Sequence, residues 1–422
     1  MTSYLSSTER KMAGRRRVLV MAPHPDDEAL GAGGFIHQAV RQGYDVYVVL
    51  MTSGDGFVQD AERYYLSLTV TSEEYIHLGY ERQIEAQKAM AALGVPKERV
   101  IFLGFPDGGL DHLFLHYDAA ALFVSPTTGC SRGPYIESPT YGTPYTGAEL
   151  LNAIIRLFTE IQPDWVVTPL MLDQHPDHWA TSAFGSLALM ACRAQGLSWA
   201  EHTVHLGYLV HWNGWPLPLA YRPEMRQEVP PSLTTYPGLR WEEFGYDAPT
   251  VEAKRVSLLS YESQVELIKP FLLAFARKTE VFGRVTPTVV DQEAVWPQPR
   301  AESLTKFLRR DYGIVASRWR HRQGQDHVQC RVKLEGLWSA RVVVYAWGKG
   351  LEFSGWTSGM QGGDDPGLLV TPSADHVDLT WSVSETGTER EWLKGIVFYR
   401  NNKITGRTGF WPWLSADPER KG

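Results

Sequence analysis

The segment that decides the expected fold is Val18-Leu19-Val20-Met21-Ala22-Pro23-His24-Pro25-Asp26-Asp27-Glu28. Its first half is a short apolar run, which is typical of a strand buried on both faces of a parallel sheet. Pro25 stiffens the corner where the run stops, and from Asp27 to Gln42 apolar residues recur at helical spacing. The chain therefore turns from strand to helix at one imidazole and three carboxylates, where open α/β sheets bind their ligands.

His24, Asp26 and Asp27 at one rigid corner are suitable ligands for a borderline divalent ion such as zinc. An ordinary explanation is also open, because aspartate is a common helix N-cap and His-Pro-Asp is a common turn. The chain repeats this chemistry much later, where an apolar strand at 165–168 leads into Asp173-Gln174-His175-Pro176-Asp177-His178 and another helix. Two strand ends that both carry His-Pro-Asp favour one composite site at the rim of one sheet.

Pro-His-Pro-Asp-Asp-Glu at 23–28 followed by His-Pro-Asp-His at 175–178 resembles the zinc-dependent N-acetylglucosaminyl deacetylase family. This LmbE-like and PIG-L-like family includes phosphatidylinositol-glycan de-N-acetylases and the deacetylases of mycothiol and bacillithiol synthesis. The resemblance covers residues 17–283. It implies a Rossmann-like, mostly parallel sheet flanked by helices, a single divalent metal, and hydrolysis of an acetamido group on a sugar.

The resemblance also implies a role for each motif residue. The implied metal ligands are His24, Asp27 and His178, and the metal is Zn²⁺, with Fe²⁺ as the alternative. Asp26 resembles the general base, His175 the group that stabilises the intermediate or protonates the leaving amine, and Asp177 the carboxylate that tunes His175. This division suits the chemistry, because three protein ligands leave an open position at a catalytic zinc ion.

One position departs from the pattern. Some family members carry a tyrosine two residues before the first histidine of the second motif, as an oxyanion donor. Here that residue is Asp173, which cannot donate a hydrogen bond when ionised. The donor would then be His175 with the metal, or a tyrosine of the loop at 125–147, and Asp173 would orient a histidine ring.

Three further residues are predicted to contact substrate. Asp55, in the Gly-rich end of the strand 44–51, and Asp107, in the turn after the strand 99–104, resemble acidic family positions. Arg82 resembles an arginine on the substrate side, although it could simply pair with Glu85 on one helix face.

The long loop at 125–147 carries three tyrosines, namely Tyr135, Tyr141 and Tyr145. A loop of this length predicts a functional lid, and the alternative is a surface excursion with buried tyrosines. His205 and His211 alternate onto one face of a predicted strand at 204–211, and single histidines of this kind are more often packed than ligating.

The whole chain has 422 residues, 43% of them hydrophobic, which supports two or three domains. A net charge of −7 argues against nucleic acid as the main partner, and three scattered cysteines indicate a cytoplasmic protein. The apolar run at 18–22 is too short for a signal peptide, and no apolar run is long enough for a transmembrane segment.

We expect four parts: an N-terminal tail (1–16), the deacetylase domain (17–283), a linker (284–312) that includes a short helix at 301–310, and a β-sandwich accessory domain (313–422). The last prediction depends on period-two alternation, as at 328–334 and 377–383. The expected function is metal-dependent removal of acetyl from an N-acetylated amino sugar. The alternatives are an amidase for a larger sugar–thiol or other amide conjugate, and a non-catalytic carbohydrate-binding protein.

Overall fold

The computed structural model describes residues 15–57, 61, 65, 69–117, 121–236 and 239–285, and after these only the strand residues named below. The chain divides into two compact units. One consists of Met1–Val229 and Trp241–Arg284, and the other of Pro230–Arg240 and Val285–Gly422.

The first unit is built on a seven-stranded sheet in the order β3-β2-β1-β4-β5-β7-β6. Its strands are β1 (Arg17–Ala22), β2 (Asp45–Thr52), β3 (Val100–Phe105), β4 (Trp165–Pro169), β5 (Val204–Tyr208), β6 (Leu239–Gly245) and β7 (Thr279–Val285). Strands β1 to β5 run parallel, and β7 pairs antiparallel with β5. The order 3-2-1-4-5 places the topological switch point between β1 and β4. The predicted Rossmann-like, mostly parallel sheet is confirmed.

The central strands are buried throughout, which explains their unbroken apolar sequences. Every residue of β2 is buried, and in β1 only Arg17 is partly exposed. A strand covered by helices on both faces has no solvent side, so it shows no alternation of apolar and polar residues.

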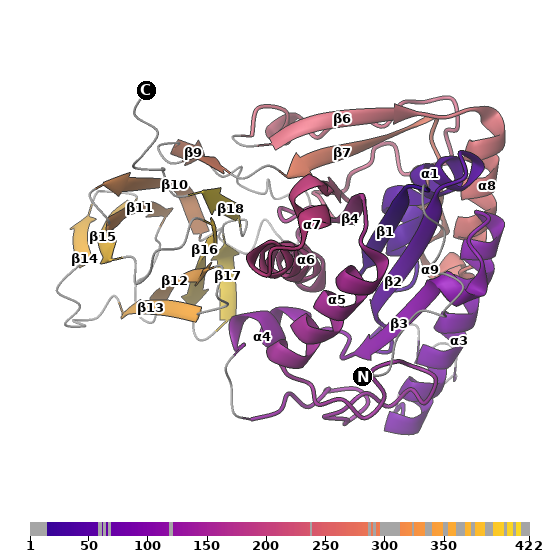
Figure 1. Ribbon diagram of the computed structural model, residues 1–422, viewed down its shortest axis with the longest axis horizontal. Coiled ribbons are helices and arrows are strands. Elements are labelled where there is room, and N and C mark those ends of the chain that lie inside the picture. The colour runs from indigo at the N-terminus through magenta and orange to yellow at the C-terminus, as the bar shows by residue number, and fades with distance from the viewer. Residues whose placement is uncertain are drawn as a thin grey trace. The chain divides into compact units, whose positions relative to one another are not determined.

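Helices cover both faces of this sheet (Figure 1). On one face α1 (Asp27–Arg41), α3 (Ser72–Ala92), α8 (Ala248–Leu259) and α9 (Glu262–Ala274) pack together. On the other face α6 (Pro176–Ala194) packs against α4 (Leu110–Leu115), α5 (Gly147–Ile161) and α7 (Ser198–His202). Two short 3₁₀ turns, η2 (Lys97–Arg99) and η3 (Pro231–Leu233), complete the described helical segments.

Helix α3 begins at Ser72, where Thr71 and Glu74 form a capping box. Helices α8 and α9 meet near Tyr261. One predicted boundary is wrong, that of the strand at 204–211. Strand β5 ends at Tyr208, so His211 lies beyond the strand and the predicted alternation does not reach it.

Helix α1 packs unusually closely against its neighbours through its glycines. A Cβ atom on Gly31 would lie 2.0 Å from the Tyr208 ring, and one on Gly34 would lie 2.4 Å from the Tyr246 ring. In the same part of α1, the backbone N–H groups of Gly34 and Phe35 donate to the Glu280 carboxylate at 2.8 and 3.0 Å. The small residues therefore let α1 approach the sheet and a buried carboxylate.

That carboxylate has a buried cationic partner. Lys254 Nζ lies 2.6 Å from Glu280 Oε1 and donates to the carbonyl oxygen of Leu30 at 2.7 Å. Both charged side chains are 1% exposed. The pair connects α8, β7 and α1, which is the helix that begins in the first His-Pro-Asp motif.

Strand β3 forms an edge of the sheet, and hydroxyl groups of the long loop cover its outer carbonyls. Ser138 Oγ donates to the carbonyl of Phe102 at 2.7 Å, and Tyr145 OH donates to that of Gly104 at 3.0 Å. Thr140 Oγ1 donates to the carbonyl of Leu103 between them. Three side chains of the loop therefore satisfy backbone carbonyls of this edge strand.

In the second unit the described residues form two sheets. Their orders are β14-β15-β11-β10-β9 and β13-β12-β16-β18-β8, and β17 pairs with β16. The strands are β8 (Thr288–Val289), β9 (Glu293–Val295), β10 (Gly313–Arg322), β11 (Gln325–Lys333), β12 (Ala340–Gly348), β13 (Phe353–Gly359), β14 (Leu368–Pro372), β15 (His376–Ser384), β16 (Glu391–Arg400), β17 (Lys403–Arg407) and β18 (Trp411–Leu414). The described strand pairs of this unit are antiparallel except β18 with β8, which is parallel.

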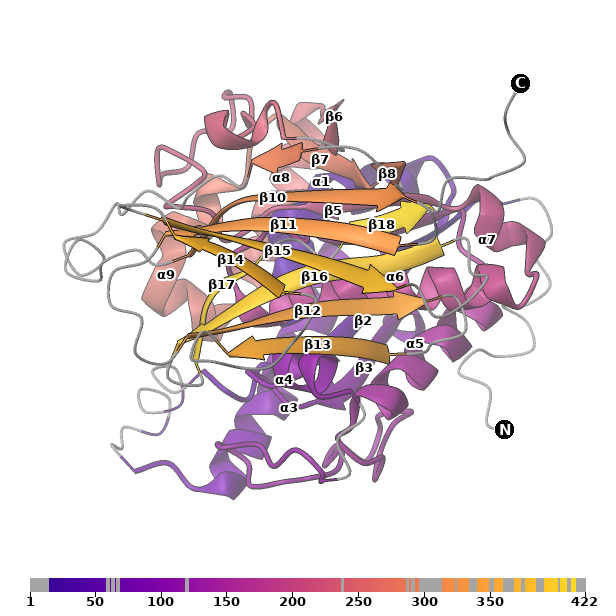
Figure 2. The ribbon, with the colours of Figure 1, turned by 90° about the vertical axis from the view of Figure 1, so that its left-hand side faces the viewer.

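The two alternating segments quoted from the sequence are neighbouring strands, β11 and β15 (Figure 2). Their apolar residues lie directly opposite one another, with Val328 facing Trp381 and Cys330 facing Leu379. The prediction of a C-terminal all-β region is confirmed. The predicted domain boundaries stay a prediction, and the predicted helix at 301–310 lies outside the described residues.

Candidate active site

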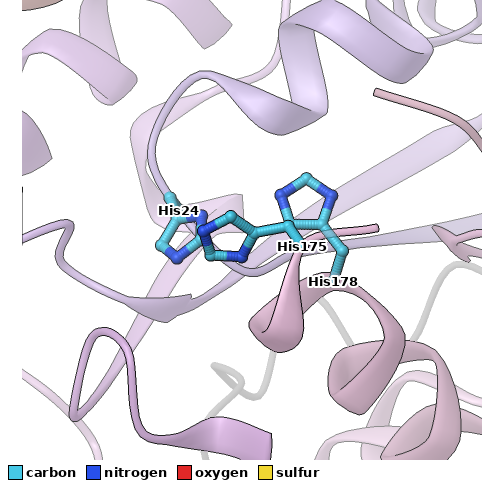
Figure 3. A group of neighbouring side chains, drawn as sticks. All are labelled: His24, His175 and His178. Atoms are coloured by element: carbon cyan, nitrogen blue, oxygen red, sulfur yellow. The ribbon is translucent and has the colours of Figure 1, made fainter. Parts of the chain in front are cut away.

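The two His-Pro-Asp motifs meet because their strands are neighbours. Strand β1 pairs in parallel with β4, with Val18 opposite Trp165 and Val20 opposite Val167. Their carboxyl ends therefore reach the same rim, where β1 leads into His24 and β4 leads into His175 and His178. Figure 3 shows these three imidazoles gathered together, with His175 and His178 at the start of α6.

The first corner is held in a strained backbone conformation. Asp26 has a φ of 121° and a ψ of −30°, which a residue with a Cβ atom rarely adopts. Its carbonyl accepts from the backbone N–H groups of Ala29 and Leu30 at 3.0 and 2.8 Å, which anchors the corner to the first turn of α1. Strain at a ligand-bearing corner is typical of functional sites.

Asp27 places one carboxylate oxygen between two imidazoles. Its Oδ2 atom lies 3.0 Å from His24 Nδ1 and 3.1 Å from His178 Nε2. Burial alone would raise the pKa of Asp27, but the His178 and His24 rings hold that pKa well below its usual value. The carboxylate is therefore ionised and its oxygen is available as a ligand.

Two of the separations among these three residues suit the ligands of one divalent ion. Two ligands of one tetrahedral zinc ion at ordinary bond lengths lie about 3.3 Å apart, close to both observed separations. Both ring nitrogens of the fully buried His178 lack a hydrogen bond of good geometry among the described residues, although carboxylates are near. An ion bound at this point would satisfy the buried Nε2 atom.

Two more carboxylates surround the other nitrogen of His24. His24 Nε2 lies 3.0 Å from Asp177 Oδ2 and 3.1 Å from Asp107 Oδ1. Asp177 also accepts from the backbone N–H groups of Gly108 and Leu110 at 2.7 and 3.0 Å. The Asp177 carboxylate therefore binds His24 and the loop after β3, whereas only its backbone N–H bonds to the His175 ring, at 3.2 Å.

Asp173 is a buried acceptor that joins three segments. Its Oδ1 accepts from the backbone N–H of His175 at 3.0 Å, and its Oδ2 accepts from those of Val210 and His211 at 2.9 Å. Oδ2 also lies 3.4 Å from His178 Nδ1. Burial would raise the pKa of Asp173, but the charge of His178 and hydrogen bonds lower it below its usual value. This placement agrees with the prediction that Asp173 orients a histidine ring.

A fourth histidine, His211, joins the cluster. Its ring centroid lies 4.7 Å from that of His178 and 5.3 Å from that of His175. Asp27, His178 and His211 form one group of potential ligands, as do His24, His175 and His178. His205, by contrast, is packed within the sheet and hydrogen-bonded to Thr168 Oγ1 at 2.9 Å.

Comparisons with known proteins identify a family for this part of the chain. The family model PIG-L, described as GlcNAc-PI de-N-acetylase, matches residues 19–189, which include both motifs. The chain carries a PIG-L domain. This is the family that the two motifs resemble, that of the LmbE-like and PIG-L-like de-N-acetylases.

Two relatives show how far the similarity extends. The glucosamine-6-phosphate deaminase-like protein of Bacteroides thetaiotaomicron is 24% identical over 319 residues, which cover 71% of this chain and 44% of that protein. A 1D-myo-inositol 2-acetamido-2-deoxy-alpha-D-glucopyranoside deacetylase of Tsukamurella paurometabola is 33% identical over 194 residues, 43% of this chain and 58% of that protein. The chain thus spans about half the length of each relative.

Among solved structures, the N,N'-diacetylchitobiose deacetylase of Pyrococcus horikoshii is similar, with 20% identity and a TM-score of 0.36. The match covers 61% of this chain and 76% of that chain. Within the described part of the protein, no helix combines the length and hydropathy needed to cross a bilayer.

Arg82 of the PIG-L domain binds the two loops that flank the catalytic corner. Its guanidinium donates to the carbonyls of Pro25 and Gly54 at 2.7 and 2.8 Å, and lies 3.7 Å from Asp26 Oδ2. Glu85 accepts from the backbone and side chain of Ser263. Arg82 is 3% exposed, so these contacts favour a structural role, and its predicted contact with substrate stays a prediction.

Asp55 and the long loop meet in a buried contact. Tyr135 OH donates to Asp55 Oδ2 at 2.5 Å, and both residues are 1% exposed. Burial, and then the nearby charge of Asp107, raises the pKa of Asp55 to about 7. Tyr145 is also buried, and Tyr141 is exposed. This arrangement agrees with the alternative of a surface excursion with buried tyrosines, and substrate contacts of Asp55 and Asp107 stay predictions.

Proposed function

We propose that the PIG-L domain hydrolyses the N-acetyl group of an N-acetylated amino sugar, using one divalent metal ion. The observation that carries the proposal is the Asp27 oxygen shared by His24 and His178 at 3.0 and 3.1 Å. These separations suit three protein ligands of a single ion, which leave a position open for water.

The metal would be held by His24, Asp27 and His178. When bound, it would lower the pKa of a water molecule to about 7 and polarise the amide carbonyl. Zn²⁺ suits this nitrogen and oxygen donor set, and Fe²⁺ is the alternative.

Each remaining motif residue has a step that suits its position. Asp26, next to the ligand Asp27, takes the proton of the attacking water as the new carbon–oxygen bond forms. His175, at the partly exposed mouth of the cluster, gives a proton to the amine as the carbon–nitrogen bond breaks. The products are acetate and the free amino sugar. Asp177 holds the His24 ring, which it contacts at 3.0 Å.

Acetate release tests this proposal directly. The purified protein would be assayed with N-acetylglucosamine as the free sugar, as an aglycone-linked sugar and as short oligomers, and its metal content would be measured in parallel. We expect release that a chelator abolishes and Zn²⁺ restores. Bound metal with no acetate from any of these sugars would contradict the proposal and favour a larger amide substrate or a binding protein.

A further inference from the structure

The position of His211 is fixed by contacts from two other segments of the PIG-L domain. Its backbone N–H donates to Asp173 Oδ2 at 2.9 Å, and its carbonyl accepts from the N–H of Gln174 at 3.0 Å. Its ring stacks on Phe271 of α9, with centroids 6.0 Å apart and planes 13° apart. The backbone and the ring are therefore both held before any substrate arrives.

The imidazole of His211 is available on the solvent side of the site. Its ring nitrogens make no hydrogen bond to the residues that the structure describes, and the side chain is partly exposed. His178 and Asp27 are 0% and 2% exposed. A ring nitrogen of His211 lies within 4.8 Å of ligand atoms of both. His211 is thus a partly exposed neighbour of two buried residues that we propose as metal ligands.

Several other candidate donors for a developing oxyanion are already occupied, whereas His175 is assigned to the leaving amine. Tyr135 donates to Asp55, and Tyr145 donates to the carbonyl of Gly104. Asp173 is an acceptor for three backbone N–H groups. His24 lies between carboxylates on both of its ring nitrogens.

We propose that His211 donates a hydrogen bond to the carbonyl oxygen of the substrate as this oxygen becomes negatively charged. The inference rests on the proposed deacetylation. As water adds to the carbonyl carbon, the π electron pair of the carbonyl moves onto its oxygen, and the His211 N–H stabilises that charge without giving up its proton. The proton for the leaving amine comes from His175, so the two partly exposed rings have separate roles.

The competing explanation is that His211 is a fourth metal ligand. The arrangement of His24, Asp27 and His178 favours the role of hydrogen-bond donor. His24, Asp27 and His178 already form a contiguous set joined at 3.0 and 3.1 Å. A fourth protein ligand would fill the position that water needs at a catalytic ion. His211 is partly exposed whereas Asp27 and His178 are buried, so we expect a carbonyl group that enters from solvent to reach His211.

Three variants separate these roles. His211→Phe keeps an aromatic ring beside Phe271 and removes the donor, and His211→Gln restores an N–H donor. His202→Phe is the matched control, since His202 is exposed on α7 away from the cluster. With a sugar that the unchanged protein deacetylates, we expect His211→Phe to lower kcat about 10²- to 10³-fold with little change in KM. His211→Gln should recover at least about tenfold of this loss, and the control should match the unchanged protein.

Two measurements do not depend on turnover. Zinc affinity, measured by competition with a chromogenic chelator, should be the same in all variants. Affinity for a methylphosphoramidate analogue of the sugar, which carries tetrahedral oxygens in place of the acetyl group, should fall in His211→Phe as far as kcat/KM falls.

The outcomes are distinguishable. Weakened zinc binding in His211→Phe would overturn the donor role in favour of a metal ligand. Unchanged kcat and unchanged analogue affinity would overturn the inference and leave the deacetylase function standing. A zinc-loaded, unchanged protein that releases no acetate from any sugar would contradict the proposed function, and the inference would fall with it.

Discussion

Neighbouring carboxylates at the first corner have different surroundings, and therefore different expected roles. Asp27 contacts two imidazoles, whereas Asp26 carries the unusual φ of 121° and lies 3.7 Å from Arg82. We propose that Asp27 ligates the metal and that Asp26 moves a proton.

Replacing Asp26 tests that division of roles. Asp26→Asn preserves size and polarity but removes the base, so kcat should fall about 10²- to 10⁴-fold. Metal content, measured on the same preparation, should be unchanged because the substitution leaves His24, Asp27 and His178 in place. Turnover equal to that of the unchanged protein would remove Asp26 from the role of general base.

Asp55 gives a pH-dependent prediction for stability. Its pKa is raised to about 7 in the folded state and is ordinary in the unfolded chain. Between these two values the folded state binds more protons than the unfolded state, so this group makes the free energy of unfolding decrease as pH rises. An asparagine at this position would still accept from Tyr135 and does not titrate. We therefore compare the free energies of unfolding of Asp55→Asn and of the unchanged protein, measured with urea. The value for Asp55→Asn minus that for the unchanged protein should be higher at pH 8 than at pH 5. A difference between the two proteins that is the same at both pH values would show that Asp55 does not titrate in this range.

Among elements, α1 links the first His-Pro-Asp corner to the buried Lys254–Glu280 ion pair, which contacts its backbone. Removing one partner of such a pair leaves an uncompensated buried charge. Lys254→Met should therefore lower the free energy of unfolding by about 3–5 kcal/mol, measured by urea unfolding. The double variant Lys254→Met with Glu280→Gln should lose less free energy of unfolding than the two single variants lose in total.

An exposed ion pair on α8, the helix that carries Lys254, is the control. Arg255 and Glu252 lie 2.6 Å apart with side chains 30% and 52% exposed. Arg255→Met should leave stability almost unchanged, because water solvates both groups when the pair is broken. An equal effect of Lys254→Met and Arg255→Met would contradict the importance of burial for the Lys254–Glu280 pair.

The sequence was sufficient to predict the parallel sheet and the meeting of the two motifs, because both depend on local patterns. A buried run followed by His-Pro-Asp predicts a strand end, and two such ends share one rim. The position of His211 in the histidine cluster was not predicted, because the strand at 204–211 was expected to continue through it. His205 and His211 have the same spacing signal, yet one bonds to Thr168 within the sheet and the other is held by Asp173. The two histidines can therefore be told apart only by their contacts with distant segments of the chain.

At the scale of the whole molecule, the division into two compact units leads to a prediction about a truncated chain. All seven strands of the first sheet, and every proposed catalytic and metal residue, lie between residues 17 and 285. We therefore expect a chain ending at Val285 to fold, to bind metal and to retain activity towards a small N-acetylated sugar. Circular dichroism and zinc content would check this. A truncated chain that is unfolded would show that the C-terminal unit is needed for the stability of the first.

Strand β3 shows how the long loop affects the behaviour of many copies together. Its outer carbonyls are occupied by Ser138, Thr140 and Tyr145, so a second chain finds few free groups there with which to extend the sheet. Proteolytic cleavage of the loop would uncover backbone acceptors on this apolar edge strand. The nicked protein would then be prone to intermolecular strand pairing, and concentration-dependent light scattering would report on the integrity of the loop.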